Sequence, residues 1–333
     1  MQEAKLEQAV PTRRSWRFWL GIVLGLVCIG WLAYRVEWIE VGSALREMDF
    51  RWVFAALVLN LSSVPLRALR WRLMFRTYPA PPFGAMVRAM LIGQAVNALA
   101  PARLGDLARS TLVGGKSTTY VLGTLMVEIA LDLLMLAALV VLLLSQVTLP
   151  AWWRGSGEAL LATATVALAL VTAAVLSRRW IARTLDVLLR RRPRPLVHRL
   201  LSAAQQALQS LDVLGGPTLL AALGASLLVW VVYTSVNLSL LRAVTEQPPV
   251  LAALFLLAVL QLGVAVPSSP GRIGVYHYLC IQALAIFAIG DAKAVSYAIV
   301  LHLISVVVPI VLGAILAWQL GVSLWTPSRG MET

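Results

Sequence analysis

Three charged residues follow a proline inside a stretch that is otherwise apolar. Arg103, Asp106 and Arg109 lie three residues apart in "NALAPARLGDLAR", residues 97–109. On a helix this spacing places all three on one face, where the aspartate can pair with both arginines. An ionised residue at the bilayer centre costs roughly 2.5 to 3.5 kcal/mol on insertion scales, so such residues need partners or a polar cavity. This pattern predicts a site for an anionic group.

A second polar interruption lies in "QLGVAVPSSPGRIGVYHY", residues 261–278. Pro101 and Pro270 each fit the first turn of a helix, where a proline loses no hydrogen bond. The serine before Pro270 is a good N-cap, and the glycines after it permit close backbone approach. Two helix starts with free N–H groups would then face an anionic headgroup from opposite sides. The predicted substrate-binding residues are Asn97, Pro101, Arg103, Asp106, Arg109, Ser268, Ser269, Pro270, Gly271, Arg272, Gly274 and His277.

Two further acidic residues lie in an apolar segment. Glu128 and Asp132 are four residues apart and therefore share a helix face. We expect them to pair with arginines near the proline breaks. The alternative is a proton relay in which Asp106 and His277 take part. Additional positive charge at the mouths of the site is expected from Arg72, Arg76, Arg272 and His277.

The composition is that of an integral membrane protein. Of 333 residues, 60% are hydrophobic and only 13% are charged, whereas soluble domains are about half apolar. The net charge of +13 resides in segments between apolar runs, where arginines set orientation and contact anionic lipid. Nucleic-acid binding is therefore not expected. Cys28 and Cys280 both lie in apolar runs, so neither a disulfide nor a metal site is predicted, and no cofactor is expected.

The elements that must position these residues are apolar segments long enough to approach or cross a bilayer. There are nine, at 17–36, 52–69, 83–100, 119–147, 157–177, 217–242, 250–266, 272–289 and 293–318. The acidic segment between the first two is amphipathic and predicts a short helix at the outer interface.

The arginine-rich segment 178–199 decides the predicted topology. It carries eight arginines and predicts a cytoplasmic loop. If all preceding segments crossed from a cytoplasmic N-terminus, this loop would lie outside. Residues 83–117, interrupted at Pro101, are therefore predicted to form a re-entrant hairpin. Irregular backbone at membrane depth is tolerated where protein or water covers it.

The second interruption predicts a second hairpin, at 250–290. Residues 52–147 and 217–318 then form two halves of an inverted repeat within one membrane domain, residues 1–333. Interrupted helices at corresponding positions of inverted halves indicate a transport site near the midplane. The predicted fold is all-α, with about six full spans and two re-entrant hairpins. Two alternatives stay open: a solvated cytoplasmic loop at the first break, and an ordinary turn between two spans at the second.

These same residues resemble the transmembrane, flippase-like domain of the lysylphosphatidylglycerol synthases. The likeness covers roughly residues 15–320 and lies in "RALRWRLMF" (67–75), the two proline motifs and the pair Glu128 and Asp132. The chain departs from the family pattern in having Asp106 for a glutamate, and Arg272 and His277 for a glycine and a glutamate. The resemblance implies a stand-alone member, without the synthase domain, that moves a lipid between leaflets.

The leading functional hypothesis is a flippase or transporter for an anionic or modified (glyco)lipid in a bacterial inner membrane, with both termini cytoplasmic. A membrane glycosyltransferase using a lipid-linked donor is the enzymatic alternative, with Glu37, Glu40, Glu47 and Asp49 as acid–base candidates. A third alternative is a non-catalytic partner of an envelope-lipid enzyme, bound through the arginine-rich loop. The expected partners are membrane lipids with an anionic headgroup and such biosynthetic enzymes.

Overall fold

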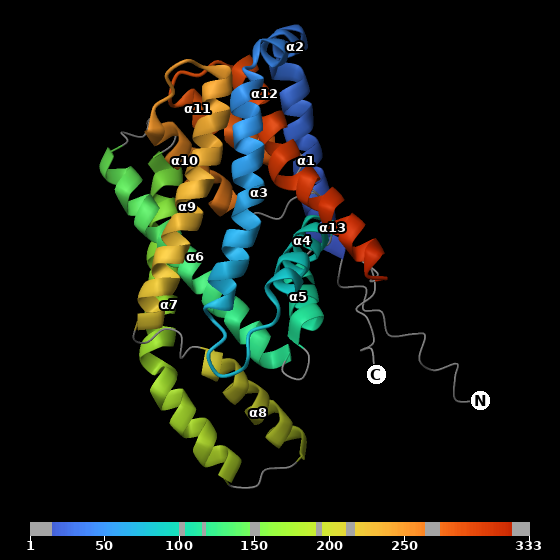
Figure 1. Ribbon diagram of the computed structural model, residues 1–333. Coiled ribbons are helices and arrows are strands. Elements are labelled where there is room, and N and C mark those ends of the chain that lie inside the picture. Colours follow the sequence, from blue (N-terminus) through green and yellow to red (C-terminus); the bar gives the residue numbers. More distant parts are fainter. Residues whose placement is uncertain are drawn as a thin grey trace, which may run out of the picture.

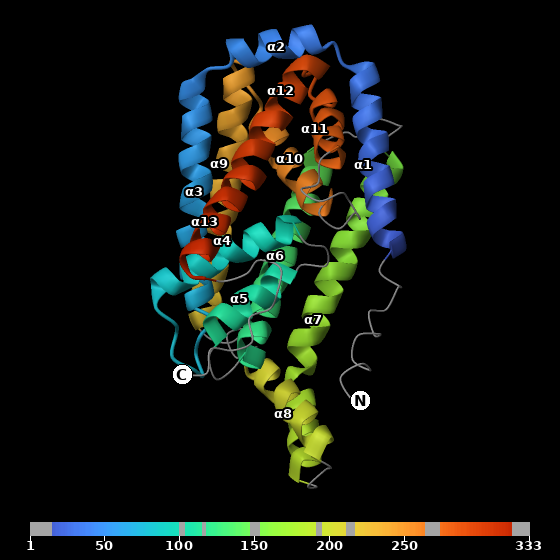
Figure 2. The same cartoon turned by 90° about the vertical axis from the view of Figure 1, so that its right-hand side faces the viewer.

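A computed structural model describes residues 15–99, 104–114, 118–146, 154–190, 195–210, 217–263 and 274–321. Within these residues the chain is all-helical (Figures 1 and 2). The helices are α1 (Ser15–Arg35), α2 (Trp38–Glu47), α3 (Phe50–Arg72), α4 (Phe83–Leu99), α5 (Leu104–Gly114), α6 (Thr118–Gln146), α7 (Arg154–Arg190), α8 (Pro195–Gln209), α9 (Pro217–Val244), α10 (Val250–Gly263), α11 (Val275–Ala285), α12 (Asp291–His302), the π-helical turn η6 (Leu303–Val307) and α13 (Val308–Gln319).

Among the described residues, four helices are long and apolar enough to cross a bilayer. They are α3, α6, α9 and the continuous helix from α12 to α13, and α4 and α10 are shorter apolar helices. Each of the nine predicted apolar segments contains a helix, and the predicted interfacial helix is α2. The prediction of an all-α polytopic membrane protein is therefore confirmed, while the number of full spans stays a prediction.

Two sets of helices build the bundle. The first set is α3 to α6 and the second set is α9 to α13. Helices α3 and α9 pack along each other in opposite directions, since the amide of Asp49, which caps α3, donates to the carbonyl of Ala243 near the end of α9 (3.1 Å). In Figures 1 and 2 the α4–α5 pair lies toward one end of the bundle and the α10–α11 pair toward the other.

The contacts of the two sets correspond. Helix α4 packs on α3, α5 and α13, and α10 packs on α9, α11 and α6. Helix α5 contacts α6 as α11 contacts α12. Each contact in one set has its counterpart in the other, which is the pattern expected if an approximate two-fold axis relates them. The two main clusters of buried apolar side chains each join both sets: one links α6 to α9, α10 and α12, and the other links α3, α4 and α6 to Ala222 of α9.

The segment expected to be a basic loop is largely helical. Helix α7 continues without a break to Arg190, and α8 begins at Pro195. The reason is local, since leucine, alanine and arginine are strong helix formers and no proline or glycine occurs between residues 158 and 192. The end of α7 and helix α8 project beyond the other helices (Figures 1 and 2), although both α7 and α8 also contact α6. The side of the membrane on which it lies stays a prediction.

A proline explains the irregular turn in the last long helix. Pro309 has no N–H, and its ring would collide with the carbonyl of Ser305 in a regular α-helix. The helix widens to a π-turn, η6, just before it. The side-chain amide of Asn60 in α3 donates to the carbonyl of Ile304 in that turn (3.0 Å). The irregularity thus ties α3 to the second set.

Candidate lipid headgroup site

A buried ion network lies between α3, α5 and α6. Its centre is Arg70, whose side chain is 0% exposed and whose guanidinium contacts Glu128 Oε1 (2.9 Å) and Asp132 Oδ1 (2.6 Å). Glu128 also accepts from Arg109 (2.8 Å) and, more weakly, from Arg67 (3.4 Å). Removing charge from water is tolerated only with such mutual pairing. The network therefore explains how five ionised side chains lie within an apolar bundle.

Helix periodicity brings these groups together. Arg67 and Arg70 are three residues apart on α3, and Glu128 and Asp132 are four apart on α6, so each pair lies on one helix face. Two tryptophan side chains contact the charged groups of the network. Trp71 lies under the Arg109 guanidinium (4.5 Å to the ring centroid), where cation–π attraction is favourable. The indole of Trp230, from α9, donates to Asp132 (3.3 Å).

The α4–α5 pair places Asp106 and Arg109 against this network. Asn97 on α4 accepts from the backbone amide of Gly105 (2.7 Å) and donates to Asp106 (3.3 Å). A Cβ atom on Gly105 would overlap the carbonyl oxygen of Gly93, so only glycine allows this approach of the two helices. Asp106 in turn lies 3.7 Å from Arg109. The predicted pairing of Asp106 with Arg109 is present.

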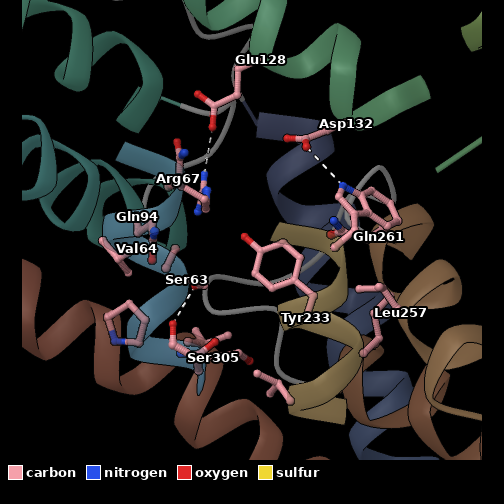
Figure 3. Close-up of a pocket in the computed structure, with 18 of the residues that line it drawn as sticks. Ser63, Val64, Arg67, Gln94, Glu128, Asp132, Tyr233, Leu257, Gln261 and Ser305 are labelled. Atoms are coloured by element: carbon pink, nitrogen blue, oxygen red, sulfur yellow. Dashed lines mark hydrogen bonds and ion pairs between the residues drawn. The ribbon is translucent and has the colours of Figure 1, made fainter. Parts of the chain in front are cut away.

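The network forms one end of a cavity of about 420 Å³ between the two helix sets (Figure 3). The first set contributes all the charged side chains, with amides, a hydroxyl and apolar groups: Asn60, Ser63, Val64, Arg67, Gln94, Asn97, Ala98, Asp106, Arg109, Leu125, Glu128, Ile129, Asp132, Leu133 and Leu136. The second set contributes uncharged groups: Trp230, Tyr233, Val236, Asn237, Leu257, Leu260, Gln261, Tyr276, Leu301, Ser305, Val306 and Pro309. We call these the charged wall and the uncharged wall.

The predicted site residues divide into three groups. Asn97, Asp106 and Arg109 line the cavity, as do Glu128 and Asp132, whose pairing with arginines was favoured over a proton relay. Gly274 and His277 are described but do not line it. The remaining predictions lie outside the described residues: Pro101, Arg103, Ser268, Ser269, Pro270, Gly271 and Arg272.

Helix α11 begins at Val275, directly after Gly274, whose φ of +88° interrupts helical geometry. The prediction that Pro270 begins a half-helix lies outside the described residues. The close backbone approach predicted at Gly274 is present, and its partner is α1. A Cβ there would lie 2.5 Å from the carbonyl oxygen of Gly25. Gly274 thus fixes α11 against α1 instead of opening the cavity to a ligand.

His277 lies behind the uncharged wall. Its ring stacks on His302 (centroids 5.1 Å apart), and the edge of Tyr276, which does line the cavity, packs on both histidines. The Tyr276 hydroxyl is 3.3 Å from the Ser305 hydroxyl. Asn237 accepts a hydrogen bond from the buried Tyr297 hydroxyl (2.6 Å). It also lines the cavity.

Several cavity residues were not predicted. Arg67 lines the cavity, and Arg70, which does not, is the most buried charge of the network beside it; both had been named only within the segment 67–75 that carries the family resemblance. Arg67 and Arg70 are three residues apart and share one helix face, as Glu128 and Asp132 do on another apolar helix. This correspondence could have predicted that the two pairs meet. Arg72 and Arg76, expected at a mouth of the site, are exposed and do not line the cavity. Gln94, Trp230, Tyr233 and Gln261 carried no sequence signal beyond their polarity.

The charges described at the cavity balance. Arg67, Arg70 and Arg109 face Asp106, Glu128 and Asp132, so these six side chains add no net positive charge. Their balance gives the described part of the cavity no excess of positive charge with which to prefer an anion. In the parts of the chain that are described, no cluster of three histidine, cysteine or acidic residues has the geometry to hold a metal ion.

Comparison with known proteins agrees with this architecture. A segment of the chain is 32% identical over 123 residues to a protein named glycosyltransferase AglD from Haloferax volcanii, a match that covers 36% of this chain and 20% of that protein. The chain thus spans about one fifth of that relative's length. No solved structure matches. The model of the family described as "Lysylphosphatidylglycerol synthase TM region" matches residues 18–313, nearly the whole chain, and the protein therefore belongs to this family of membrane proteins.

Proposed function

We propose that the protein moves a lipid between the leaflets of a bacterial inner membrane. The observation that carries this proposal is the cavity, which presents charged and polar side chains inside an apolar bundle and is lined by both helix sets. A lipid headgroup would occupy the cavity while its acyl chains stay in the bilayer. Membership of a family that contains the membrane part of lipid-modifying proteins supports a lipid as the substrate.

The proposal includes a topology. Helices α5 and α11 have 11 residues each, about 16 Å at 1.5 Å per residue, which is far short of a hydrocarbon core of about 30 Å. We propose that α4–α5 and α10–α11 are re-entrant hairpins entering from opposite faces. Helices α1, α3, α6, α7, α9 and α12–α13 would then cross fully, with both termini and the arginine-rich α7–α8 end in the cytoplasm.

Arg67 is the cation best placed to meet a headgroup. It lines the cavity, its side chain is 20% exposed, and its contact with Glu128 is the longest that Glu128 makes. Arg70 is fully enclosed by its acidic partners, and Arg109 is covered by Trp71 and paired with Glu128. The spare N–H groups of Arg67 would bind a lipid phosphate, an interaction that arginine makes with favourable geometry.

Reconstitution tests the proposal. Purified protein in liposomes with fluorescent phosphatidylglycerol, polyprenyl phosphate and glucosyl lipids should exchange at least one lipid faster than empty vesicles. We expect Arg67→Gln to slow that exchange about tenfold, the effect of losing one charged hydrogen bond. Arg72→Gln, an exposed arginine on the same helix, is the control and should exchange normally. Exchange equal to that of empty vesicles for every lipid would refute the proposal.

A glycosyltransferase is the second candidate, because of the named relative. Its expected acidic residues lie away from the cavity: Glu37, Glu40 and Glu47 are exposed at α2, and Asp49 caps α3 by accepting from the amide of Arg51 (2.9 Å). Incubation with a radiolabelled polyprenyl-phosphate sugar measures the transfer directly. Sugar transfer that disappears in Glu47→Ala, while lipid exchange persists, would favour the enzyme.

A further inference from the structure

Two glutamines occupy equivalent places in the two hairpin helices. Gln94 is the twelfth residue of α4, and Gln261 is the twelfth residue of α10. In the sequence, each helix is followed by the same pattern of proline, any residue, arginine, leucine or isoleucine, and glycine, at 101–105 and 270–274. Both side chains line the cavity, on different sides of it (Figure 3). The site is thus built with one amide from each helix set.

The side-chain amides of these two glutamines do not contribute hydrogen bonds to the fold. Within the described ranges, Gln94 and Gln261 make no hydrogen bond to a protein group, and neither does the hydroxyl of Tyr233 between them. Two other amide side chains of the cavity already make hydrogen bonds within the protein: Asn97 accepts from the backbone amide of Gly105, and Asn237 accepts from the hydroxyl of Tyr297. Polar side chains in an apolar bundle cost free energy unless they find partners. These three groups therefore have hydrogen-bonding capacity left for a ligand.

The hydrogen-bond donors and acceptors of these three groups indicate which class of ligand would satisfy them. A carboxamide offers two donors and an acceptor, a phenol offers one of each, and the Asp132 carboxylate, 36% exposed, only accepts. A phosphate has acceptors alone and would satisfy only the donors. Hydroxyl groups both donate and accept, and would satisfy all of these side chains. The rings of Trp230 and Tyr233 add apolar surface suited to the C–H face of a sugar.

We propose that Gln94 and Gln261, with Tyr233, bind the hydroxyl groups of a glycosyl headgroup. This inference rests on the proposed function and names its substrate class as a glycolipid, with the sugar in the cavity centre and any phosphate near Arg67. The balanced charges of the cavity fit an uncharged sugar better than a bare phosphate.

Native mass spectrometry tests the binding without requiring transport. The intact protein is purified in an amine-oxide detergent, because a maltoside would compete for the site. It is then mixed with equal amounts of glucosyl diacylglycerol, phosphatidylglycerol and phosphatidic acid with matched acyl chains. We expect the glucosyl lipid to be retained about tenfold better than phosphatidic acid, with phosphatidylglycerol between them.

The double variant Gln94→Leu, Gln261→Leu should lose this preference by about tenfold and bind the three lipids alike. Its melting temperature should not fall, since neither amide has a partner in the fold. Gln146→Leu, an exposed glutamine at the end of α6, is the matched control and should behave as wild type. Preference for phosphatidic acid, or a double variant that still prefers the glucosyl lipid, overturns the inference.

Leaflet exchange separates this inference from the proposed function. If a glucosyl lipid binds through the glutamines but never changes leaflets, the proposed transport function is wrong and the inferred binding site stands. If phosphatidylglycerol exchanges rapidly and equally in wild type and the double variant, the transport function stands and the inferred sugar site is wrong.

Discussion

The two helix sets share a scaffold and differ in chemistry. Asn-Leu-Ser occurs at 60–62 in α3 and again at 237–239 in α9, and in each set a buried tyrosine follows the asparagine by 60 residues, Tyr120 in α6 and Tyr297 in α12. Eight residues after these tyrosines stand Glu128 and Ser305, and twelve residues after them stand Asp132 and Pro309.

All four of these residues line the cavity. The same positions of the scaffold thus carry carboxylates in the first set, and a hydroxyl and a proline in the second. Matched positions in the two sets therefore carry side chains of different chemistry. The charged wall holds three helices together through ion pairs, whereas Tyr233 and Gln261 of the uncharged wall, like Gln94 of the charged wall, make no hydrogen bond to a described residue.

The largest expected effect is at the centre of the charged wall. Glu128→Gln keeps the shape of the side chain but leaves three arginines facing an amide, and we expect a loss of about 3–5 kcal/mol in unfolding free energy. Unfolding in detergent micelles measures it. The control, Glu47→Gln on exposed α2, should change little. If both variants have the same unfolding free energy, the ion network does not stabilise the first set. The proposed difference between the two walls would then be wrong.

Glycine substitutions test how each set fixes its hairpin. Gly105→Ala forces α5 away from the Gly93 carbonyl and should cost about 1–3 kcal/mol, with slower lipid exchange because Arg109 moves with α5. Gly274→Ala meets both a positive φ and the Gly25 carbonyl, and should loosen α11 from α1 by a similar amount. Both are measured by unfolding and by leaflet exchange.

The control for these two substitutions is Gly84→Ala in α4, where a Cβ would meet no atom within 4 Å. Alanine should raise stability there by about 0.5–1 kcal/mol, as at other open helical sites. A Gly105→Ala variant as stable as Gly84→Ala would contradict the close packing of α4 and α5.

The smallest effect is expected at the counterpart of Glu128 in the second set. The Ser305 hydroxyl already donates to the Leu301 carbonyl of its own helix (2.6 Å), so Ser305→Ala should change the unfolding free energy by less than about 1 kcal/mol. The same unfolding assay applies. A loss of unfolding free energy comparable to that of Glu128→Gln would mean that the uncharged wall also stabilises the fold. The proposed difference between a structural charged wall and a ligand-binding uncharged wall would then be wrong.

The apolar segments and their interruptions were predictable because they depend on local properties. Long apolar runs, strong helix formers and prolines act within a few residues of their own position, so every predicted segment contains a helix. The pairing of Glu128 with arginines was also predictable, since charge at bilayer depth requires a partner. The helical course of residues 178–190 was missed because charge alone was taken to indicate a loop.

The identity of the central arginine was not predictable in the same way. Arg70 stands in a basic stretch with Arg67, Arg72 and Arg76. Its three-residue spacing from Arg67 makes both candidate partners of the acidic pair, but it does not show that Arg70 is fully enclosed while Arg67 is partly exposed. The packing of α3 against both α6 and α9 makes the distinction, because it encloses one face of α3 and leaves the other open. Burial of a charge is a property of the assembled bundle.

Hydropathy and backbone propensity are local properties, and they were enough to predict a helical membrane protein whose apolar segments are interrupted by two polar, proline-containing motifs. Which charges neutralise one another, and which polar groups (Gln94, Tyr233 and Gln261) keep hydrogen-bonding capacity for a ligand, depends on the packing of the helices. Hydrogen bonds and ion pairs depend on distances of a few ångströms between residues far apart in the chain, and only the packed helices set those distances.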